Sequence, residues 1–488
     1  MSKSTIIYRD VAPGATRNAR FSGTEYDDFS QLDELRNEHE PKNIVSLERN
    51  MWVLGRGFKI LDKSEHLIPF WSAPLSDENC NLNPYPTITI DFTAQYSTTG
   101  LTVQFDEPPG AYCADLHIKW YRNGSIVAEG DFYPDTNTAV CAMQAKLFNR
   151  IEITFRRTAL PYRRVRIKQI IFGIIRKFGM DEIRSARITN QMNHISAELP
   201  ISTLDWTLDS KKDVDFMFQF KQPVEVANDD FTIGVYYINE ARRTSKSVHN
   251  IRAQDAFGVL DDDTFIGGIY VNYSAKKLFS EIVGDDFEID FGTVKDVNLT
   301  GLLEPMTKRA ALQQVLFGWG VCAATDGGEI IRVFGLDDNA EYIGLDRAYT
   351  GVSVETTASI TALSMTAHDY QEDENGSIEI NGKKYRDVQT VYTINNQDVS
   401  ENTKANVLKV ETASFINTGN VEAAAQRVYD YYMKRSTANV KIVWHGELLG
   451  GCVTVPDAWG GTHTGNVEQM DIILSNTVSA NTKVISDS

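Results

Sequence analysis

Four aromatic residues are the clearest candidates for ligand contact in this sequence. Trp71, Tyr85, Tyr96 and Tyr112 fall at the edges of expected strands or in the loops between them. Aromatic rings in such loops can stack on pyranose sugars, because the ring offers a large apolar face. The same side chains could instead cap the hydrophobic core of a β-sandwich. Core capping is the simpler interpretation, and a carbohydrate contact through these four residues is the alternative.

The sequence contains no recognisable catalytic or metal-binding motif. There is no HExxH, GxSxG or Walker A motif, and no GxGxxG opens a helix. The eight histidines are dispersed, and the charged triplet Glu38-His39-Glu40 is expected to be a solvated loop. Carboxylate pairs are too common in an acidic chain to locate a glycosidase dyad by spacing alone. We therefore predict a protein that is not an enzyme and that has no catalytic residues, no cofactor and no metal.

The cysteines and one aspartate cluster lead to the same conclusion. No CxxC pair is present, so the five cysteines are expected to be buried free thiols: Cys80, Cys113, Cys141, Cys322 and Cys452. The run Asp261-Asp262-Asp263 resembles half of a calcium loop. Its twelfth position is Asn272, where an EF-hand requires a bidentate glutamate. A solvated turn is the better interpretation.

Charge is divided unevenly along the chain. Residues 1–180 hold 22 Lys and Arg against 21 Asp and Glu, whereas the remainder holds 26 against 45 and carries nearly all of the net charge of −18. Such an acidic body repels phosphate, so we expect no tight binding of nucleic acid. No run of eighteen apolar residues and no secretory signal is present, so we expect no membrane span and folding in a reducing cytoplasm.

Hydrophobic periodicity predicts a mostly β protein with one α/β segment. Alternating apolar residues indicate a β-sandwich in 51–175, including a hairpin turn at Asn123-Gly124. Further strands follow, 214–220 among them, and then helices capped by Ser274 and Thr307. Strands return after 350, interrupted by a helix that Asn420 caps. The predicted division is an extended N-terminal arm (1–50), a β-sandwich (51–175), a first β domain (176–270), an α/β domain (271–349) and a second β domain with one helix (350–488).

Two groups of segments resemble known tail proteins. The segments 201–209, 222–226, 234–238, 253–260, 274–279, 307–317 and 330–334, in this order, are similar to phage baseplate hub proteins, and the likeness extends over roughly 180–475. Phe70-Trp-Ser-Ala73, together with Leu160-Pro-Tyr-Arg-Arg-Val-Arg-Ile167, resembles the discoidin-like jelly rolls that some tail proteins carry ahead of the hub.

This resemblance implies a structural role in a virion. A hub of this family is a homotrimer that adapts a six-fold tail tube to a three-fold tip, and each chain gives two tube-like β-barrel domains to a ring with a channel for DNA. The implied partners are the tail tube or distal tail protein, the tip or spike protein and the tape measure. The implied location is the tail tip, with assembly in the host cytoplasm.

Three interpretations of function remain open from the sequence. The first is the hub, for which the acidic C-terminal body predicts an acidic or at least phosphate-repelling channel. The second is a host-recognition tail protein that binds a cell-wall glycan through its jelly roll. The third is a cell-wall hydrolase.

Overall fold

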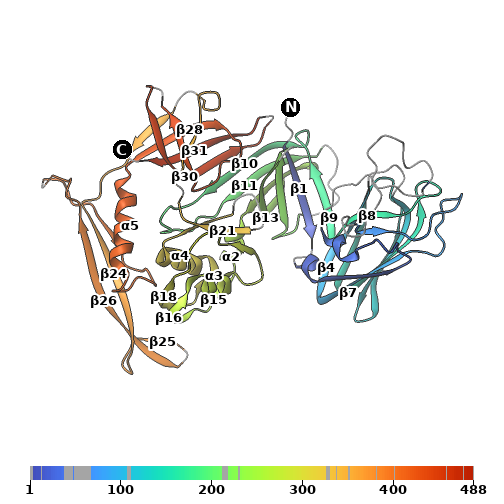
Figure 1. Cartoon of the computed structure of the whole chain (residues 1–488), viewed down its shortest axis with the longest axis horizontal. Coiled ribbons are helices and arrows are strands. Elements are labelled where there is room, and N and C mark those ends of the chain that lie inside the picture. Colours follow the sequence, from blue (N-terminus) through green and yellow to red (C-terminus); the bar gives the residue numbers. More distant parts are fainter. Residues whose placement is uncertain are drawn as a thin grey trace. The chain divides into compact units, whose positions relative to one another are not determined.

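The computed structural model (Figure 1) divides the chain into two compact units, the N-terminal unit (7–177) and the C-terminal unit (1–6 with 178–488). The chain passes between them within β1 (Ser4–Val11) and at the end of β9 (Gly173–Phe178). The described residues are 4–11, 14–37, 48, 68–106, 112–210, 218–228, 231–325, 330–336, 338–349, 352–380, 382–400, 402–457, 459–475 and 477–486. The predicted loop at Glu38–Glu40 and most of the strand predicted for 214–220 lie outside them.

The N-terminal unit is built from antiparallel strands around one hydrophobic core. Its sheet has the order β3-β8-β4-β7-β5-β6, and β2 also pairs with β4. The strands are β2 (Ala19–Thr24), β3 (Phe70–Trp71), β4 (Thr87–Phe105), β5 (Cys113–Arg122), β6 (Ser125–Phe132), β7 (Thr138–Thr158) and β8 (Arg166–Ile171). On β5 every second residue is buried, namely Leu116, Ile118 and Trp120, which is the period of a strand with one face in the core.

Local turn chemistry sets the hairpin between β5 and β6. Asn123 and Gly124 both have positive φ, 48° and 85°, as the predicted two-residue turn requires. Elsewhere the register of β4 against β7 shifts repeatedly between Asp91 and Gly100. A Cβ on Gly100 would lie 2.6 Å from the Cys141 carbonyl oxygen, so glycine permits the close approach of these two long strands.

Part of the segment predicted as an extended arm is instead folded into the N-terminal unit. Helix α1 (Ala15–Asn18) is followed by β2, which pairs with β4 from Ala19 opposite Phe92 to Thr24 opposite Thr87. The 3-10 helix η1 (Leu32–Arg36) then buries Leu35 in the core. The hydrophobic periodicity of this segment is weak because few of its side chains reach the core. Backbone hydrogen bonds to β4 hold the segment in place instead.

One large, mainly antiparallel sheet organises the C-terminal unit. Part of its order is β23-β28-β31-β30-β10-β11-β14-β13-β12, and in addition β29 pairs antiparallel with β30 and β22 pairs parallel with β29. The strands are β10 (Ile183–Gln191), β11 (Thr203–Asp209), β12 (Pro223–Asn228), β13 (Phe231–Arg243), β14 (Val248–Gln254), β22 (Glu341–Tyr342), β23 (Ser353–Thr356), β28 (Ser436–Val443), β29 (Cys452–Pro456), β30 (Thr462–Ile473) and β31 (Ser479–Ser486).

Among the described strands, the two β segments of this unit meet at one pair. β10 pairs with β30 from Arg187 opposite Ile473 to Gln191 opposite Gln469. Strands β10 to β14 come from 183–254, and strands β23 and β28 to β31 come from 353–356 and 436–486, so this pairing joins regions far apart in sequence into one sheet. The predicted mostly β class is confirmed.

The α/β segment packs helices against short strands. Its helices are α2 (Ala256–Asp261), α3 (Ala275–Val283) and α4 (Lys308–Trp319), and its small sheets contain β15 (Thr264–Phe265) with β19 (Met306–Thr307), β16 (Gly268–Ser274) with β18 (Asn298–Leu303), and β17 (Glu288–Asp290), β21 (Ile330–Phe334) and β20 (Cys322–Ala324). Ser274 Oγ accepts the Lys277 amide hydrogen at 3.1 Å, and Thr307 Oγ1 accepts that of Ala310 at 3.2 Å. Both predicted N-caps are therefore confirmed.

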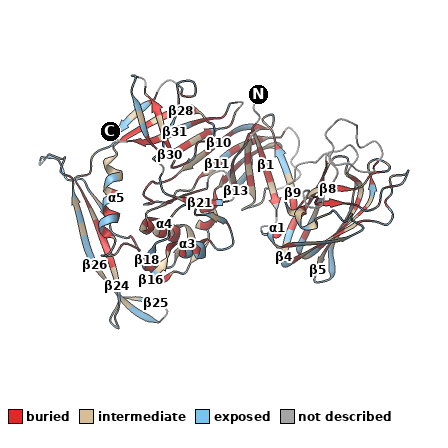
Figure 2. Ribbon diagram, in the orientation of Figure 1, coloured by how far each residue is buried: buried red, intermediate tan, exposed pale blue. Residues whose placement is uncertain are grey.

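Helix α5 (Val421–Met433) packs against a separate sheet of order β25-β26-β24-β27 (Figure 1). The strands are β24 (Ala362–Glu372), β25 (Ile378–Ile380), β26 (Lys383–Asn395) and β27 (Val407–Val410), and β26 is largely exposed (Figure 2). Asn420 stands at the N-cap position, but its side chain does not cap the helix. Its Oδ1 accepts the Asn417 amide hydrogen and its Nδ2 donates to the Phe415 carbonyl, both at 2.8 Å. Asn420 therefore fixes the turn before α5, which corrects the predicted cap.

The independence of the N-terminal unit can be tested with two fragments. We expect residues 7–177 to unfold as one cooperative transition, because the fragment keeps β2 and η1 on the core. A fragment of 51–177 should be markedly less stable, since it exposes the edge of β4 and the surface that Leu35 covers. Thermal unfolding followed by circular dichroism compares the two. Equal stability of the fragments would show that the first 50 residues are an arm after all.

Asp255 should give the C-terminal unit a distinctive pH dependence. Its buried carboxylate accepts the amide hydrogens of Ser202 (3.0 Å) and Gly258 (3.2 Å), and burial raises its pKa to about 6. The folded state therefore holds this proton more tightly than the unfolded state, and stability is lost as the pH rises from about 4 through 6. Asp255→Asn keeps an accepting oxygen and removes the charge.

Relative to the wild type, Asp255→Asn should gain up to about 3 kcal/mol in free energy of unfolding between pH 4 and pH 7. Urea denaturation across this range measures the difference. Glu379→Gln, an exposed change on β25, is the control and should show no such trend. A pH-independent difference for Asp255→Asn would contradict the assignment.

Candidate functional site

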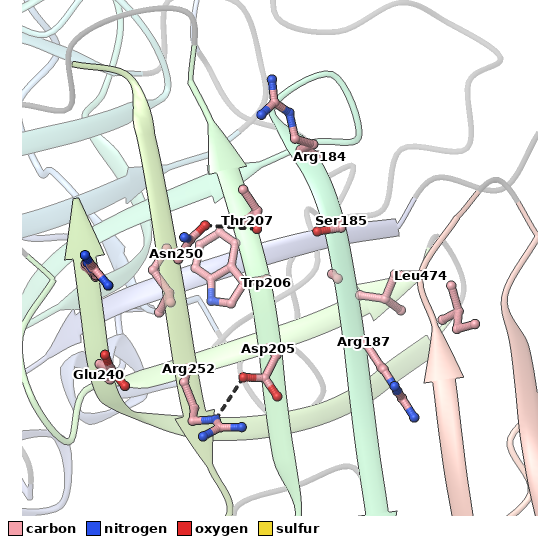
Figure 3. Close-up of a pocket in the computed structure, with 14 residues that line it drawn as sticks. Arg184, Ser185, Arg187, Asp205, Trp206, Thr207, Glu240, Asn250, Arg252 and Leu474 are labelled. Carbon is pink, nitrogen blue, oxygen red and sulfur yellow. Dashed lines mark hydrogen bonds and ion pairs between the residues drawn. The ribbon is translucent and has the colours of Figure 1, made fainter. Parts of the chain in front are cut away.

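The outward face of the large sheet forms a shallow cavity of about 680 Å³ over β10, β11, β14 and β13 (Figure 3). Strand alternation creates it. On β11 Leu204, Trp206 and Leu208 are buried, so that Asp205 and Thr207 point outward. The outward residues of β10 and β14 follow the same rule, and nine of the fourteen described lining residues are polar or charged.

A row of alternating charge crosses this face. Strand pairing places Arg187 opposite Asp205, Asp205 opposite Arg252, and Arg252 opposite Glu240. Arg252 Nε lies 2.8 Å from Asp205 Oδ1, the contact marked in Figure 3. Opposite charges on directly facing residues are the favourable cross-strand arrangement. The register of three antiparallel ladders therefore generates the pattern.

One ion pair extends the row across β30, and a second lies beside it. Arg187 lies 2.7 Å from Asp471 on β30, and Thr189 Oγ1 donates to the same carboxylate at 2.9 Å. Arg184 lies 3.2 Å from Asp209, beside the bulge at the start of β10. The Arg187–Asp471 pair thus connects the outward faces of the two β segments at the β10–β30 seam.

Charge on this face is compensated. Of the described residues, four arginines (184, 187, 242 and 252) line the cavity, and four carboxylates lie in or directly beside it (205, 209, 240 and 471). The side chains are substantially exposed, so each ion pair contributes only about 0–1 kcal/mol to stability. The described lining residues include no cysteine, histidine or lysine, and Thr207 Oγ1 donates to the Asn250 side chain at 3.1 Å. The face can hydrogen-bond water and small polar groups, but it offers neither a nucleophile nor a net charge.

The aspartate run at 261–263 is neutralised by basic side chains. Arg309 lies 3.0 Å from Asp261, Lys221 lies 3.2 Å from Asp262, and Lys308 lies 3.9 Å from Asp263. Within the described part of the chain no group of three or more His, Cys, Asp or Glu side chains is arranged to hold a metal ion.

The cysteines are free, and all but Cys80 are buried. Burial raises the pKa of the Cys113 thiol to about 11 and those of Cys141 and Cys322 to about 12. Thiols with such a pKa hold almost no thiolate near neutral pH, so these three are unreactive. The prediction of buried free thiols is confirmed for the four buried residues.

The four aromatic candidates have different surroundings. Trp71 is buried, and the Arg166 guanidinium lies 3.9 Å from the centre of its ring. Tyr96 and Tyr112 are partly buried and pack against the core of the N-terminal unit. Tyr85 is 52% exposed. Protein contacts therefore engage Trp71, Tyr96 and Tyr112, and of the four only Tyr85 presents most of its surface to solvent.

Sequence reasoning did not identify the charged row. Polar and apolar residues alternate in the two segments that carry most of the row, Thr203-Leu-Asp-Trp-Thr-Leu-Asp209 and Asn250-Ile-Arg252. Each segment alone predicts only a strand with one wet face. The charge compensation becomes visible once the register places Arg252 opposite Asp205.

None of the described helices has the length and apolar character that crossing a bilayer requires. No protein-family model and no curated protein matches the sequence.

The chain does resemble solved structures of tail proteins. It is similar to the tail protein from Neisseria meningitidis MC58 (12% identity, 64% of this chain and 94% of that chain, TM-score 0.48). It is also similar to the 43 kDa tail protein of prophage MuSo2 from Shewanella oneidensis (12%, 64% and 96%, TM-score 0.44). A third match is an E. coli component of the type VI secretion system with structural similarity to the T4 tail proteins gp27 and gp5 (10%, 63% and 74%, TM-score 0.40).

Truncation of Trp71 should destabilise the protein strongly, whereas truncation of Tyr85 should have little effect on its stability. Trp71→Ala removes a buried ring and the partner of Arg166, and we expect a loss of about 3–5 kcal/mol in the free energy of unfolding. Tyr85→Ala, at an exposed site, should change it by less than about 0.5 kcal/mol. Guanidinium denaturation followed by circular dichroism measures both. A stable, fully folded Trp71→Ala would show that this ring is available for another role.

Proposed function

We propose that this protein is a structural component of a phage-type tail, not an enzyme, and that it acts as the hub of the tail tip. In this proposal three copies form a ring that adapts a six-fold tail tube to a three-fold tip. The observation that carries it is the continuous sheet in which β10 pairs with β30. Each chain thereby holds two β segments side by side. A trimer would contain six such segments, which is the number needed to match a six-fold tail tube.

The ordered succession of hub-like segments in the sequence supports the same proposal. The segments 201–209, 234–238 and 253–260 correspond to β11, part of β13, and the end of β14 with most of α2. A ring arises when one surface of a subunit meets a different surface of its neighbour and the rotation closes. A chain with two sheet segments in fixed relation is suited to such repetition.

We further propose that the charge-compensated face of β10, β11, β14 and β13 lines the channel for DNA. A basic lining would exchange with the counterions of each phosphate and hold the polymer. Here arginines such as Arg187 and Arg252 lie against carboxylates at 2.7 and 2.8 Å, so little net charge faces a passing duplex. The lining would then be neutral, in place of the acidic one expected from composition, and the acidic excess of 181–488 would lie on other surfaces.

The proposal also names partners and a location. A ring at the tip would contact the tail tube or distal tail protein on one side and the tip or spike protein on the other, with the tape measure in its channel. The protein would be part of the virion and would assemble in the host cytoplasm. Recognition of a host glycan by a jelly-roll-like N-terminal unit remains an additional prediction.

The purified full-length protein and intact particles should both reveal the symmetry. We expect light scattering to report a trimer, and electron microscopy to show a three-fold ring with six β lobes around a central opening. A reconstruction should place Arg187, Asp205 and Arg252 at that opening. A stable monomer with no ring in either preparation would contradict the hub proposal, and a ring with these residues on its outer wall would contradict the lining alone.

A further inference from the structure

A second cavity, in the N-terminal unit, has the chemistry of an anion-binding site. It measures about 390 Å³ and lies where α1 and β2 meet η1 and β4. Three of its lining residues are arginines, and one is a carboxylate: Arg17, Arg20, Arg36 and Asp33. Asn18 and Thr93 add an amide and a hydroxyl. The lining is thus cationic and rich in hydrogen-bond donors.

Arg36 is held in place with part of its guanidinium unused. Its Nε donates to the Asp33 carbonyl at 2.8 Å and its Nη2 to Asp33 Oδ1 at 2.9 Å. These contacts leave Nη1 without a partner among the described residues. A guanidinium fixed through two of its nitrogens loses little further freedom when the third binds a ligand.

Arg20 has no side-chain partner in the described part of the chain. Strand pairing places it opposite Asp91 on β4, but Asp91 accepts from Arg150 Nε at 2.6 Å. Arg150 faces Asp91 from the other side, on β7. Asp91 therefore lies between two arginines and hydrogen-bonds to only one of them, so the Arg20 guanidinium contributes a positive charge to the cavity.

Tyr96 anchors the wall that carries Arg17. Its hydroxyl accepts a hydrogen bond from Asn18 Nδ2 at 2.5 Å and donates to the Gly14 carbonyl at 3.3 Å. These two contacts span the ends of the segment 14–18, so the tyrosine ties α1 to β4. Its ring packs edge-on against Phe92, 5.4 Å between centroids. The hydroxyl thus positions the cavity wall while the ring belongs to the core.

We infer that this cavity binds the oxyanion of an acidic saccharide, a carboxylate or a phosphate ester. Guanidinium groups match both anions through paired hydrogen bonds, and ligand charge relieves the repulsion among neighbouring arginines. The Asn18 amide and Thr93 hydroxyl suit the hydroxyl groups beside such an anion. Nucleic acid fits less well, because its affinity rests on many phosphate contacts along a surface and this is one confined cavity. The inference does not depend on the hub proposal.

Isothermal titration of the full-length protein at low ionic strength tests the site. The probes are glucuronate and inorganic phosphate, with glucose as the uncharged control. We expect binding of at least one anion, none of glucose, and weakening by added salt. Binding of phosphate without glucuronate indicates a phosphate ester as the anion of the ligand, and the reverse indicates the carboxylate of a uronic acid. Failure of both anions to bind at millimolar concentration would overturn the inference.

Arginine variants locate the binding. Arg20→Gln and Arg36→Gln should each weaken it at least tenfold. Arg122→Gln removes the same charge from an exposed position on β5 and should change it less than twofold. Equal weakening by Arg122→Gln would show that only the overall charge of the protein is sensed.

Tyr96→Phe separates the two roles of the tyrosine. It keeps the ring and removes the hydroxyl, so it should weaken anion binding severalfold while the melting temperature stays nearly unchanged. Unchanged anion affinity would overturn the positioning role of the hydroxyl.

Discussion

The C-terminal unit depends on the antiparallel pairing of β10 with β30. Backbone hydrogen bonds between these strands join a sheet made from 183–254 to one made from 353–356 and 436–486. Because side chains alternate along each strand, this register also decides which residues share a face. A shift of one residue would place Arg187 and Asp471 on opposite faces and expose either Ile188 or Ile472, both of which are now fully buried. The same pairing thus fixes both the core and the charged surface.

Structures that a few adjacent residues determine could be predicted from the sequence. The Asn123-Gly124 turn and the caps at Ser274 and Thr307 each rest on one side chain or one positive φ acting on its immediate neighbours. Parts of β4, β5 and β7 could be predicted because apolar and polar residues alternate along them, as in strands with one buried face. Asn420 shows the limit of such rules. Its position was right, yet its amide satisfies groups of the preceding turn, and the choice between two nearby sets of partners depends on how the turn packs.

Contacts between distant segments could not be predicted in this way. The pairing of Thr189 with Asp471 joins residues 282 apart, and nothing in either local pattern selects the other. The pairing of β2 with β4 was missed for a related reason, because a strand at a sheet edge needs only backbone groups and leaves a weak hydrophobic pattern. The surroundings of Trp71 follow from Arg166, 95 positions further on in the chain, whose guanidinium covers the ring.

Overall composition does not show how charge is distributed over the surface. The chain from 181 onward has 45 acidic residues against 26 basic ones, yet the open face of the sheet balances arginines with carboxylates. Net charge is a sum over the whole surface, whereas cross-strand pairing selects opposite charges at facing positions. The same logic applies in the N-terminal unit with the opposite result. Asp91 faces both Arg20 and Arg150 but hydrogen-bonds only to Arg150. A cavity lined by several arginines therefore occurs in a unit whose overall charge is nearly neutral. Strand register, more than overall composition, decides where this protein is charged.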